Sequence, residues 1–199
     1  SQQLFPLAPW VDLMRAAGLG SDTAMLQALQ PAWQSELASL LPELAGRPDL
    51  GDDEGMAPAR QARLFEAIVQ WLALVSQRAP TLLLIEDLHW SDETSLRLLA
   101  TVARRAQTWP LTLVLSARDE ALQTQAVLRR TLRELAQGPR YLRMDLQALS
   151  RQQTASLVVA LQRSGADQQA SARLAERVWS ASEGNPFVVV ETMRNLADL

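Results

Sequence analysis

The residues most capable of chemistry follow a short apolar run near the middle of the chain. Residues 82–85 are all apolar, Glu86 and Asp87 follow them directly, and the only histidine, His89, comes next but one. A continuous apolar run of this length is typical of a strand buried on both faces, as in a parallel sheet covered by helices. Ligands of such sheets bind beyond the carboxyl ends of the strands. Two adjacent carboxylates there could hold Mg²⁺, directly or through water, and orient an attacking water molecule.

Two other stretches carry candidate site residues. Arg118 follows a second apolar run, residues 111–115, and Gly184, Asn185 and Pro186 precede the last helical pattern. Arg118 alone is also compatible with a surface ion pair. The Gly-Asn-Pro sequence alone is most simply a turn followed by a helix start. The position of Arg118 along the chain, after the acidic pair, makes it a candidate for the same site, whereas Pro186 becomes a candidate only through the resemblance given below.

The composition is that of an ordinary globular protein. The chain has 199 residues, of which 48% are hydrophobic and 21% charged, with a net charge of -3 and no cysteine. The arginines form no basic block, so contact with nucleic acid is not expected. Zero cysteines exclude disulfides and thiolate metal sites. No apolar run approaches the roughly 18 to 20 residues of a membrane span, and we expect a cytoplasmic protein.

The sequence contains no lysine, because all 19 residues counted as Lys or Arg are Arg. A phosphate-binding Walker A loop, G-x-x-x-x-G-K-[S/T], needs a lysine to reach the β- and γ-phosphates. Residues 46–51 imitate its glycine spacing, but Asp52, Asp53 and Glu54 follow and would repel a phosphate. We interpret the stretch as an acidic loop. The chain therefore carries no intact Walker A loop.

The hydrophobic pattern predicts alternating helices and strands. Short helices are expected within residues 10–41, and longer ones over 59–77, from a cap at Ser91 to Ala106, and over 123–137. Strands are expected over residues 82–85, 111–115 and, with a weaker, partly polar pattern, 141–146. Helices between strands imply right-handed crossovers and a parallel sheet.

After Leu149 the pattern changes to helices alone. Ser150 and Gln153 fit a capping box, and two more helices follow, the last after Pro186. The predicted fold class is therefore α/β: an incomplete parallel sheet of the P-loop NTPase type with flanking helices, followed by a small all-helical subdomain. We place the domains at residues 1–149, a partial nucleotide-binding domain, and 150–199, a helical lid.

Taken together, these stretches resemble the STAND branch of AAA-type ATPases, an origin-recognition-like ATPase domain found in large LuxR-type transcriptional regulators and in some cyclases and protein kinases. The similar segments are L-L-L-I-E-D-L-H-W-S-D at residues 82–92, L-V-L-S-A-R at 113–118 and E-G-N-P-F at 183–187. The opening P-L-A-P-W-V-D-L at residues 6–13 also resembles the segment after that family's second strand. The resemblance covers nearly the whole chain, beginning after the Walker A loop.

The resemblance implies roles for individual residues. Glu86 corresponds to the Walker B position that binds Mg²⁺ and Asp87 to the neighbour that polarises water, although the two roles could be exchanged. Arg118 corresponds to the arginine that senses the γ-phosphate. Gly184, Asn185 and Pro186 would bind the nucleotide, with the proline near the adenine. The family's P-loop strand would lie between the strands at 111–115 and 141–146, so we expect a gap in the sheet. The isolated chain would then be marginally stable, or another segment would cover the gap.

The leading hypothesis is that the chain is part of an ATP-binding and ATP-hydrolysing signalling switch, which uses ATP and Mg²⁺ in the complete protein. Its expected partners are the nucleotide, other domains of the same polypeptide and a homo-oligomer formed on activation, without membrane contact. Alternatively, the chain is a non-catalytic helical interaction module derived from such an ATPase. A phospho-acceptor receiver domain would also use strand-end carboxylates, but it ordinarily needs a lysine. The phosphate-binding half would lie upstream of Ser1 or be absent.

Overall fold

The computed structural model describes residues 6–41, 43–44, 58–162 and 167–197, in two compact units, Ser1–Leu142 and Arg143–Leu199. The expected acidic loop lies outside the described residues. No helix in the described ranges is long and apolar enough to cross a membrane. The first unit contains α1 (Ala8–Ala16), α2 (Thr23–Ala28), α3 (Pro31–Leu40), α4 (Pro58–Arg78), β1 (Thr81–Ile85), η1 (Leu88–Trp90), α5 (Glu93–Arg105), η2 (Ala106–Thr108), β2 (Leu111–Leu115), α6 (Asp119–Thr124) and α7 (Ala126–Ala136). The second contains α8 (Arg151–Leu161), α9 (Gln168–Ser182) and α10 (Pro186–Ala197).

The described part of the first unit contains a parallel sheet of two strands. β1 pairs with β2 in the order Thr81↔Leu111 to Ile85↔Leu115, and α5 forms the crossover between them. Because the strands are parallel and in register, both end at the same edge of the sheet. The predicted fold class, a small parallel sheet with flanking helices followed by a helical subdomain, is confirmed.

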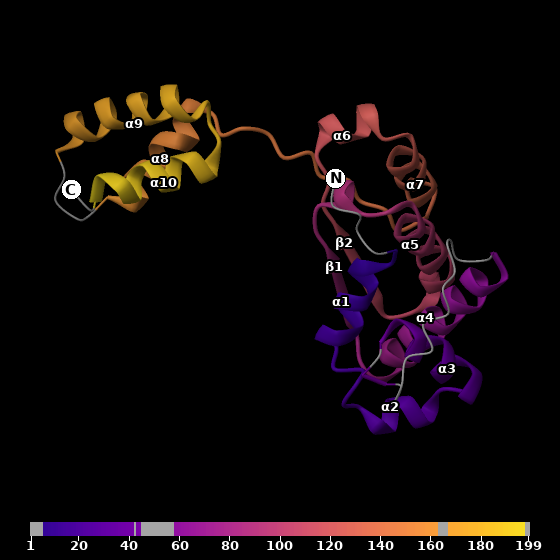
Figure 1. Ribbon diagram of the computed structural model, residues 1–199. Coiled ribbons are helices and arrows are strands. Elements are labelled where there is room, and N and C mark those ends of the chain that lie inside the picture. Colours follow the sequence, from indigo (N-terminus) through magenta and orange to yellow (C-terminus); the bar gives the residue numbers. More distant parts are fainter. Residues whose placement is uncertain (1–5, 42, 45–57, 163–166, 198–199) are drawn as a thin grey trace. The chain divides into compact units, whose positions relative to one another are not determined.

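The two strands are buried on one face only, which corrects the prediction of two buried faces. Leu83 is 2% exposed, whereas its neighbours Leu82 and Leu84 are 66% and 54% exposed, and Val114 of β2 is 43% exposed. In Figure 1, α4, α5 and α7 gather on one side of β1 and β2. Successive strand residues point to opposite faces, so every second side chain turns away from these helices.

The prediction of a third strand at residues 141–146 is wrong. Residues 141–149, all of them described, contain no helix or strand. The apolar members of the alternating pattern are solvent-exposed: Leu142 is 79%, Met144 76% and Leu146 94% exposed. A strand forms only when a neighbouring edge satisfies its backbone groups, and in the described chain β2 pairs with β1 alone. Residues 141–146 therefore carry the alternating pattern of a strand but pair with no strand of the described chain.

The core of the first unit joins helices that are distant in sequence. Leu64, Ile68, Trp71 and Leu72 lie on the buried face of α4. Trp10 of α1 is 1% exposed, and its indole N–H donates a hydrogen bond to the carbonyl of Ser95, at 3.2 Å. These contacts hold α1 and α4 in the same hydrophobic cluster as the strands.

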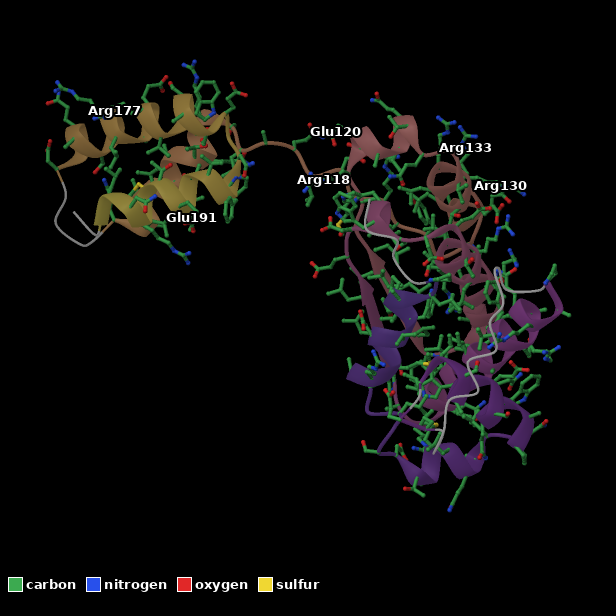
Figure 2. The ribbon with its side chains drawn as sticks, viewed as in Figure 1. Arg118, Glu120, Arg130, Arg133, Arg177 and Glu191 are labelled. Carbon is green, nitrogen blue, oxygen red and sulfur yellow. The ribbon has the colours of Figure 1, made fainter. Side chains whose placement is uncertain are left out.

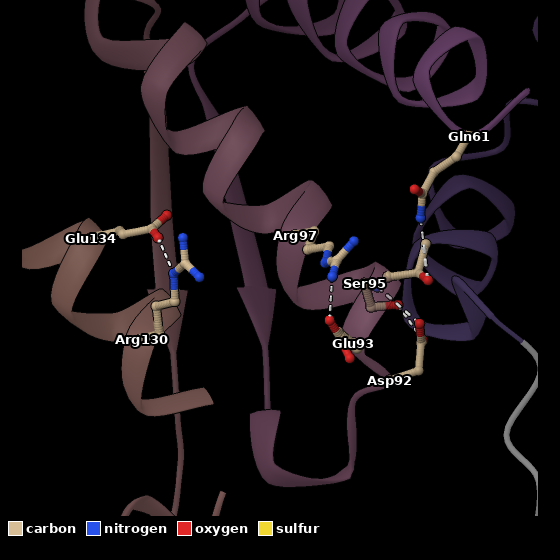
Figure 3. A network of polar contacts seen from close by, with 8 residues as sticks. Gln61, Asp92, Glu93, Ser95, Arg97, Arg130 and Glu134 are labelled. Carbon is tan, nitrogen blue, oxygen red and sulfur yellow. Dashed lines mark hydrogen bonds and ion pairs between the residues drawn. The ribbon is translucent and has the colours of Figure 1, made fainter. Parts of the chain in front are cut away.

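The helix after β1 begins one residue later than predicted. Its N-cap is Asp92 rather than Ser91, because the Asp92 carboxylate accepts the Ser95 N–H at 2.9 Å and also the Ser95 hydroxyl. The same carboxylate accepts the Leu7 N–H at 3.1 Å, which ties the segment before α1 to this turn. Figure 3 shows this cap beside the ion pair of Glu93 with Arg97. Asp92 therefore has a structural role.

The helix predicted over residues 123–137 is interrupted near its start: α7 forms most of it, and α6 begins before it, at Asp119. The break lies at Gln125, whose backbone is extended, with φ -101° and ψ 99°. The Gln125 side-chain amide donates to the carbonyl of His89 at 3.0 Å. This hydrogen bond joins the break to the turn that follows β1.

The second unit is a bundle of α8, α9 and α10 around Val158, Val178, Val189 and Met193. The predicted capping box is confirmed, because the Gln153 N–H donates to the Ser150 hydroxyl at 3.2 Å and the Ser150 N–H to the Gln153 side chain at 2.9 Å.

Candidate functional site

The turn after β1 is fixed by the end of β2. The Ser116 N–H donates to the carbonyl of Ile85 at 3.1 Å, and the Leu88 N–H donates to the carbonyl of Ser116 at 2.9 Å. In addition, the Asp87 N–H donates to the Ser116 hydroxyl at 2.9 Å. Three hydrogen bonds made by Ser116, one donated and two accepted, therefore hold the backbone on both sides of Glu86 and Asp87.

Asp87 combines a fixed backbone with an accessible carboxylate. Its backbone is left-handed, with φ 53° and ψ 48°, a region that aspartate enters more readily than most residues. Its carbonyl accepts the Trp90 N–H at 2.8 Å. The Asp87 side chain is 56% exposed, and Glu86 is exposed as well. Both carboxylates are available to a ligand beyond the strand end.

The imidazole of His89 is buried beneath this turn. Its side chain is 6% exposed, and its Nδ1 lies 3.8 Å from the Asp87 Oδ1. Its ring packs against Trp90, with 5.1 Å between the ring centroids. Trp90 itself is 65% exposed.

Arg118 lies just beyond β2, at the N-cap position of α6, and is exposed. Because β1 and β2 end at the same edge, the structure brings Arg118 to the same end of the sheet as Glu86 and Asp87. Figure 2 shows Arg118 and Glu120 at the surface beside the start of α6. A guanidinium in this position can contact an anion bound over the strand ends.

The two carboxylates supply only part of the ligand set of Mg²⁺, and water or a nucleotide supplies the rest. Within the described ranges, no three His, Cys, Asp or Glu side chains are grouped so as to hold a metal ion. Mg²⁺ is ordinarily bound by one or two protein carboxylates together with substrate phosphates and water. Glu86 and Asp87 fit that pattern, with the remaining ligands coming from a nucleotide and solvent.

The other candidate residues belong to the second unit, where they form a turn and a helix start. Gly184 has φ +80°, and its carbonyl accepts the Leu149 N–H at 2.8 Å. Asn185 accepts the Phe187 N–H at 3.0 Å through its side-chain oxygen, at the start of α10. Asn185 and Pro186 are exposed, whereas Gly184 is buried. These contacts explain Gly184 and Asn185 structurally, and Pro186 is the first residue of α10, a position that proline favours. Asn185 and Pro186 remain accessible.

A family model described as an AAA ATPase domain matches residues 1–116 of the 199-residue chain, which is more than half of it. The chain belongs to the AAA ATPase domain family. Comparison with curated proteins and with solved structures finds no match. The family assignment makes this a nucleotide-binding, ATPase-type domain. The matched residues include both strands, Glu86, Asp87 and Ser116, but not Arg118 or the second unit.

Two residues that shape the strand-end turn of this AAA ATPase domain were not singled out in the sequence. Ser116 fixes Asp87 through its hydroxyl, and Gln125 holds the carbonyl of His89 from the break between α6 and α7. A small polar residue directly after a strand is the only sequence signal for Ser116. Gln125 has no comparable signal, because its partner is 36 positions away in the chain.

Proposed function

We propose that this AAA ATPase domain is part of an ATP-binding and ATP-hydrolysing signalling switch within a larger transcriptional regulator or signalling protein. The observation that supports this most is the pair of exposed carboxylates, Glu86 and Asp87, on a backbone fixed by Ser116 at the carboxyl end of a parallel strand. Strand-end carboxylates in P-loop proteins position a divalent cation and water against a terminal phosphate.

Each residue of the strand-end site has a proposed role. One of Glu86 and Asp87 binds Mg²⁺, and the other accepts a hydrogen bond from the attacking water and takes up its proton. Mg²⁺, when bound, neutralises charge on the β- and γ-phosphates. Arg118 binds the γ-phosphate through its guanidinium, a contact that ends when the phosphate leaves. Asp87 is the preferred residue for the water, because in the resemblance described above it corresponds to the neighbour of the metal-binding Walker B residue.

The second unit is proposed to act as the lid of the switch. Gly184, Asn185 and Pro186 would bind the nucleotide, with Pro186 near the adenine. The exposure of Asn185 and Pro186 supports this role, because an accessible turn at a helix start can contact a ligand. Other domains of the same polypeptide, and a homo-oligomer formed on activation, would read the nucleotide state in the cytoplasm.

A non-catalytic interaction module is the second candidate. It is favoured by the lack of lysine in the sequence and by the exposed apolar face formed by Leu82, Leu84 and Val114. The sequence that precedes Ser1 in the complete polypeptide separates the two. A G-x-x-x-x-G-K-[S/T] motif there supports the switch, and its absence supports the module.

We expect residues 1–199 by themselves to bind ATP too weakly for detection by calorimetry at micromolar concentrations. The phosphates carry most of the charge of ATP, and the chain has no lysine or Walker A loop to surround them. The complete polypeptide, measured under the same conditions with Mg²⁺, should bind and hydrolyse ATP. Micromolar affinity in residues 1–199 would contradict the expectation for the isolated chain. Failure of the complete polypeptide to bind would contradict the switch.

A further inference from the structure

The imidazole of His89 is the most unusual polar group in the strand-end turn. It is nine-tenths buried, and neither Nδ1 nor Nε2 has a hydrogen-bond partner among the described residues. A buried nitrogen without a partner costs free energy, so each such group calls for an explanation. The nearest charged atom given by the structure is the Asp87 Oδ1, 3.8 Å from Nδ1.

Hydrogen bonds hold the backbone around this pair, whereas the Asp87 side chain is 56% exposed. The Asp87 N–H is held by the Ser116 hydroxyl, and the Asp87 carbonyl accepts the Trp90 N–H. The carbonyl of His89 is held by Gln125, and its ring is covered on one side by Trp90. A rotation of the half-exposed Asp87 carboxylate can shorten the 3.8 Å separation to a hydrogen bond of about 2.8 Å.

We infer that His89 is a positioning residue for Asp87. Its Nδ1–H donates to the Asp87 carboxylate and fixes the rotamer of that side chain, so that the second carboxylate oxygen faces the ligand side of the strand end. This inference rests on the proposed function, because it explains how the carboxylate proposed to receive the water is oriented. His89 touches neither water nor nucleotide in this arrangement.

The arrangement sets the tautomer of the neutral imidazole. A donor at Nδ1 requires the proton on that nitrogen and leaves Nε2 as an acceptor. Without an acceptor beside Nδ1, nothing in the surroundings of the ring favours a proton on that nitrogen. The tautomer can be measured directly, because His89 is the only histidine in the sequence and every imidazole signal belongs to it.

The test is a long-range ¹⁵N–¹H correlation spectrum of the neutral imidazole in residues 1–199. We expect the Nδ1–H tautomer in the wild type and in Asp87→Asn, which keeps an acceptor oxygen, and a shift toward Nε2–H in Asp87→Ala, which removes it. A wild-type ring protonated at Nε2 would overturn the inference without any variant. An unchanged tautomer in a folded Asp87→Ala chain would also overturn it.

A second experiment compares the ATP turnover of two His89 variants of the complete protein. The side-chain amide of His89→Asn can replace Nδ1–H, whereas that of His89→Gln reaches the position of Nε2. We expect His89→Gln to lower turnover about tenfold more than His89→Asn, with ATP affinity unchanged. Equal losses would assign His89 a packing role only. If the complete protein hydrolyses no ATP, the proposed function fails, while the tautomer still decides the contact between His89 and Asp87.

Discussion

Replacing Asp87 by Asn lowers ATP turnover of the complete protein by about 100-fold or more, while ATP affinity changes little. A general base contributes roughly 10² to 10⁴ in rate, and an amide cannot take up a proton from water. Affinity is retained because the amide keeps the size and one acceptor oxygen of the carboxylate. Steady-state hydrolysis and equilibrium binding of ATP, measured on the same preparation, check both parts of this expectation.

Glu93→Gln provides the matched control for this substitution. Glu93 is also an exposed carboxylate near the strand end, but it lies in the first turn of α5 and pairs with Arg97. An exposed ion pair of this kind contributes only about 0 to 1 kcal/mol, so turnover should remain at the wild-type level. Wild-type turnover in Asp87→Asn would remove Asp87 from its proposed role.

Replacing Gly184 by Ala destabilises the second unit by about 2 to 4 kcal/mol, the sum of backbone strain and overpacking. A Cβ at this position would lie 2.2 Å from the carbonyl oxygen of Leu149 and 3.0 Å from its nitrogen, and the φ of +80° is unfavourable for alanine. The new Cβ would meet backbone atoms of Leu149, so no flexible side chain can move to relieve the contact. Hydrogen exchange of α8 and α10 measures the loss.

Gly20→Ala is the control for this prediction. A Cβ on Gly20 would meet the Glu43 and Leu44 side chains at 3.6 and 3.9 Å, which is ordinary van der Waals contact. Its effect should stay within about 0.5 kcal/mol. If Gly184→Ala were as mild as Gly20→Ala, the close approach of Gly184 to Leu149 would be refuted.

The sequence predicts the positions of the helices and strands better than it predicts which of their faces are buried and which strands pair. The helical face of α4 and the positions of β1 and β2 follow from local periodicity, and both agree with the structure. The exposure of Leu82 and Leu84 could not be predicted, because a uniformly apolar strand looks the same whether one or two of its faces are covered. Residues 141–146 show the same limit, since an alternating pattern does not reveal whether a partner strand exists.

The sequence likewise predicts the candidate site residues but not the contacts that hold them. The candidates Glu86, Asp87 and Arg118 are predicted from their positions after apolar strands, and the parallel register brings both strand ends to one edge. The hydrogen bonds of Ser116 and Gln125 depend on residues 29 and 36 positions apart, which only the fold brings together. The left-handed backbone of Asp87 lies within this hydrogen-bonded turn.

The most direct test of the central claim, that the adjacent carboxylates of Glu86 and Asp87 form a divalent-cation site at the end of β1, is a titration of residues 1–199 with Mn²⁺. His89 supplies a single reporter, because its Nδ1 lies 3.8 Å from the Asp87 Oδ1 and no other histidine is present. We expect the imidazole proton signals to broaden at low Mn²⁺ concentration and to remain sharp in the Glu86→Gln, Asp87→Asn double variant. Sharp signals in the wild type, or equal broadening in the double variant, would contradict a metal site at these carboxylates.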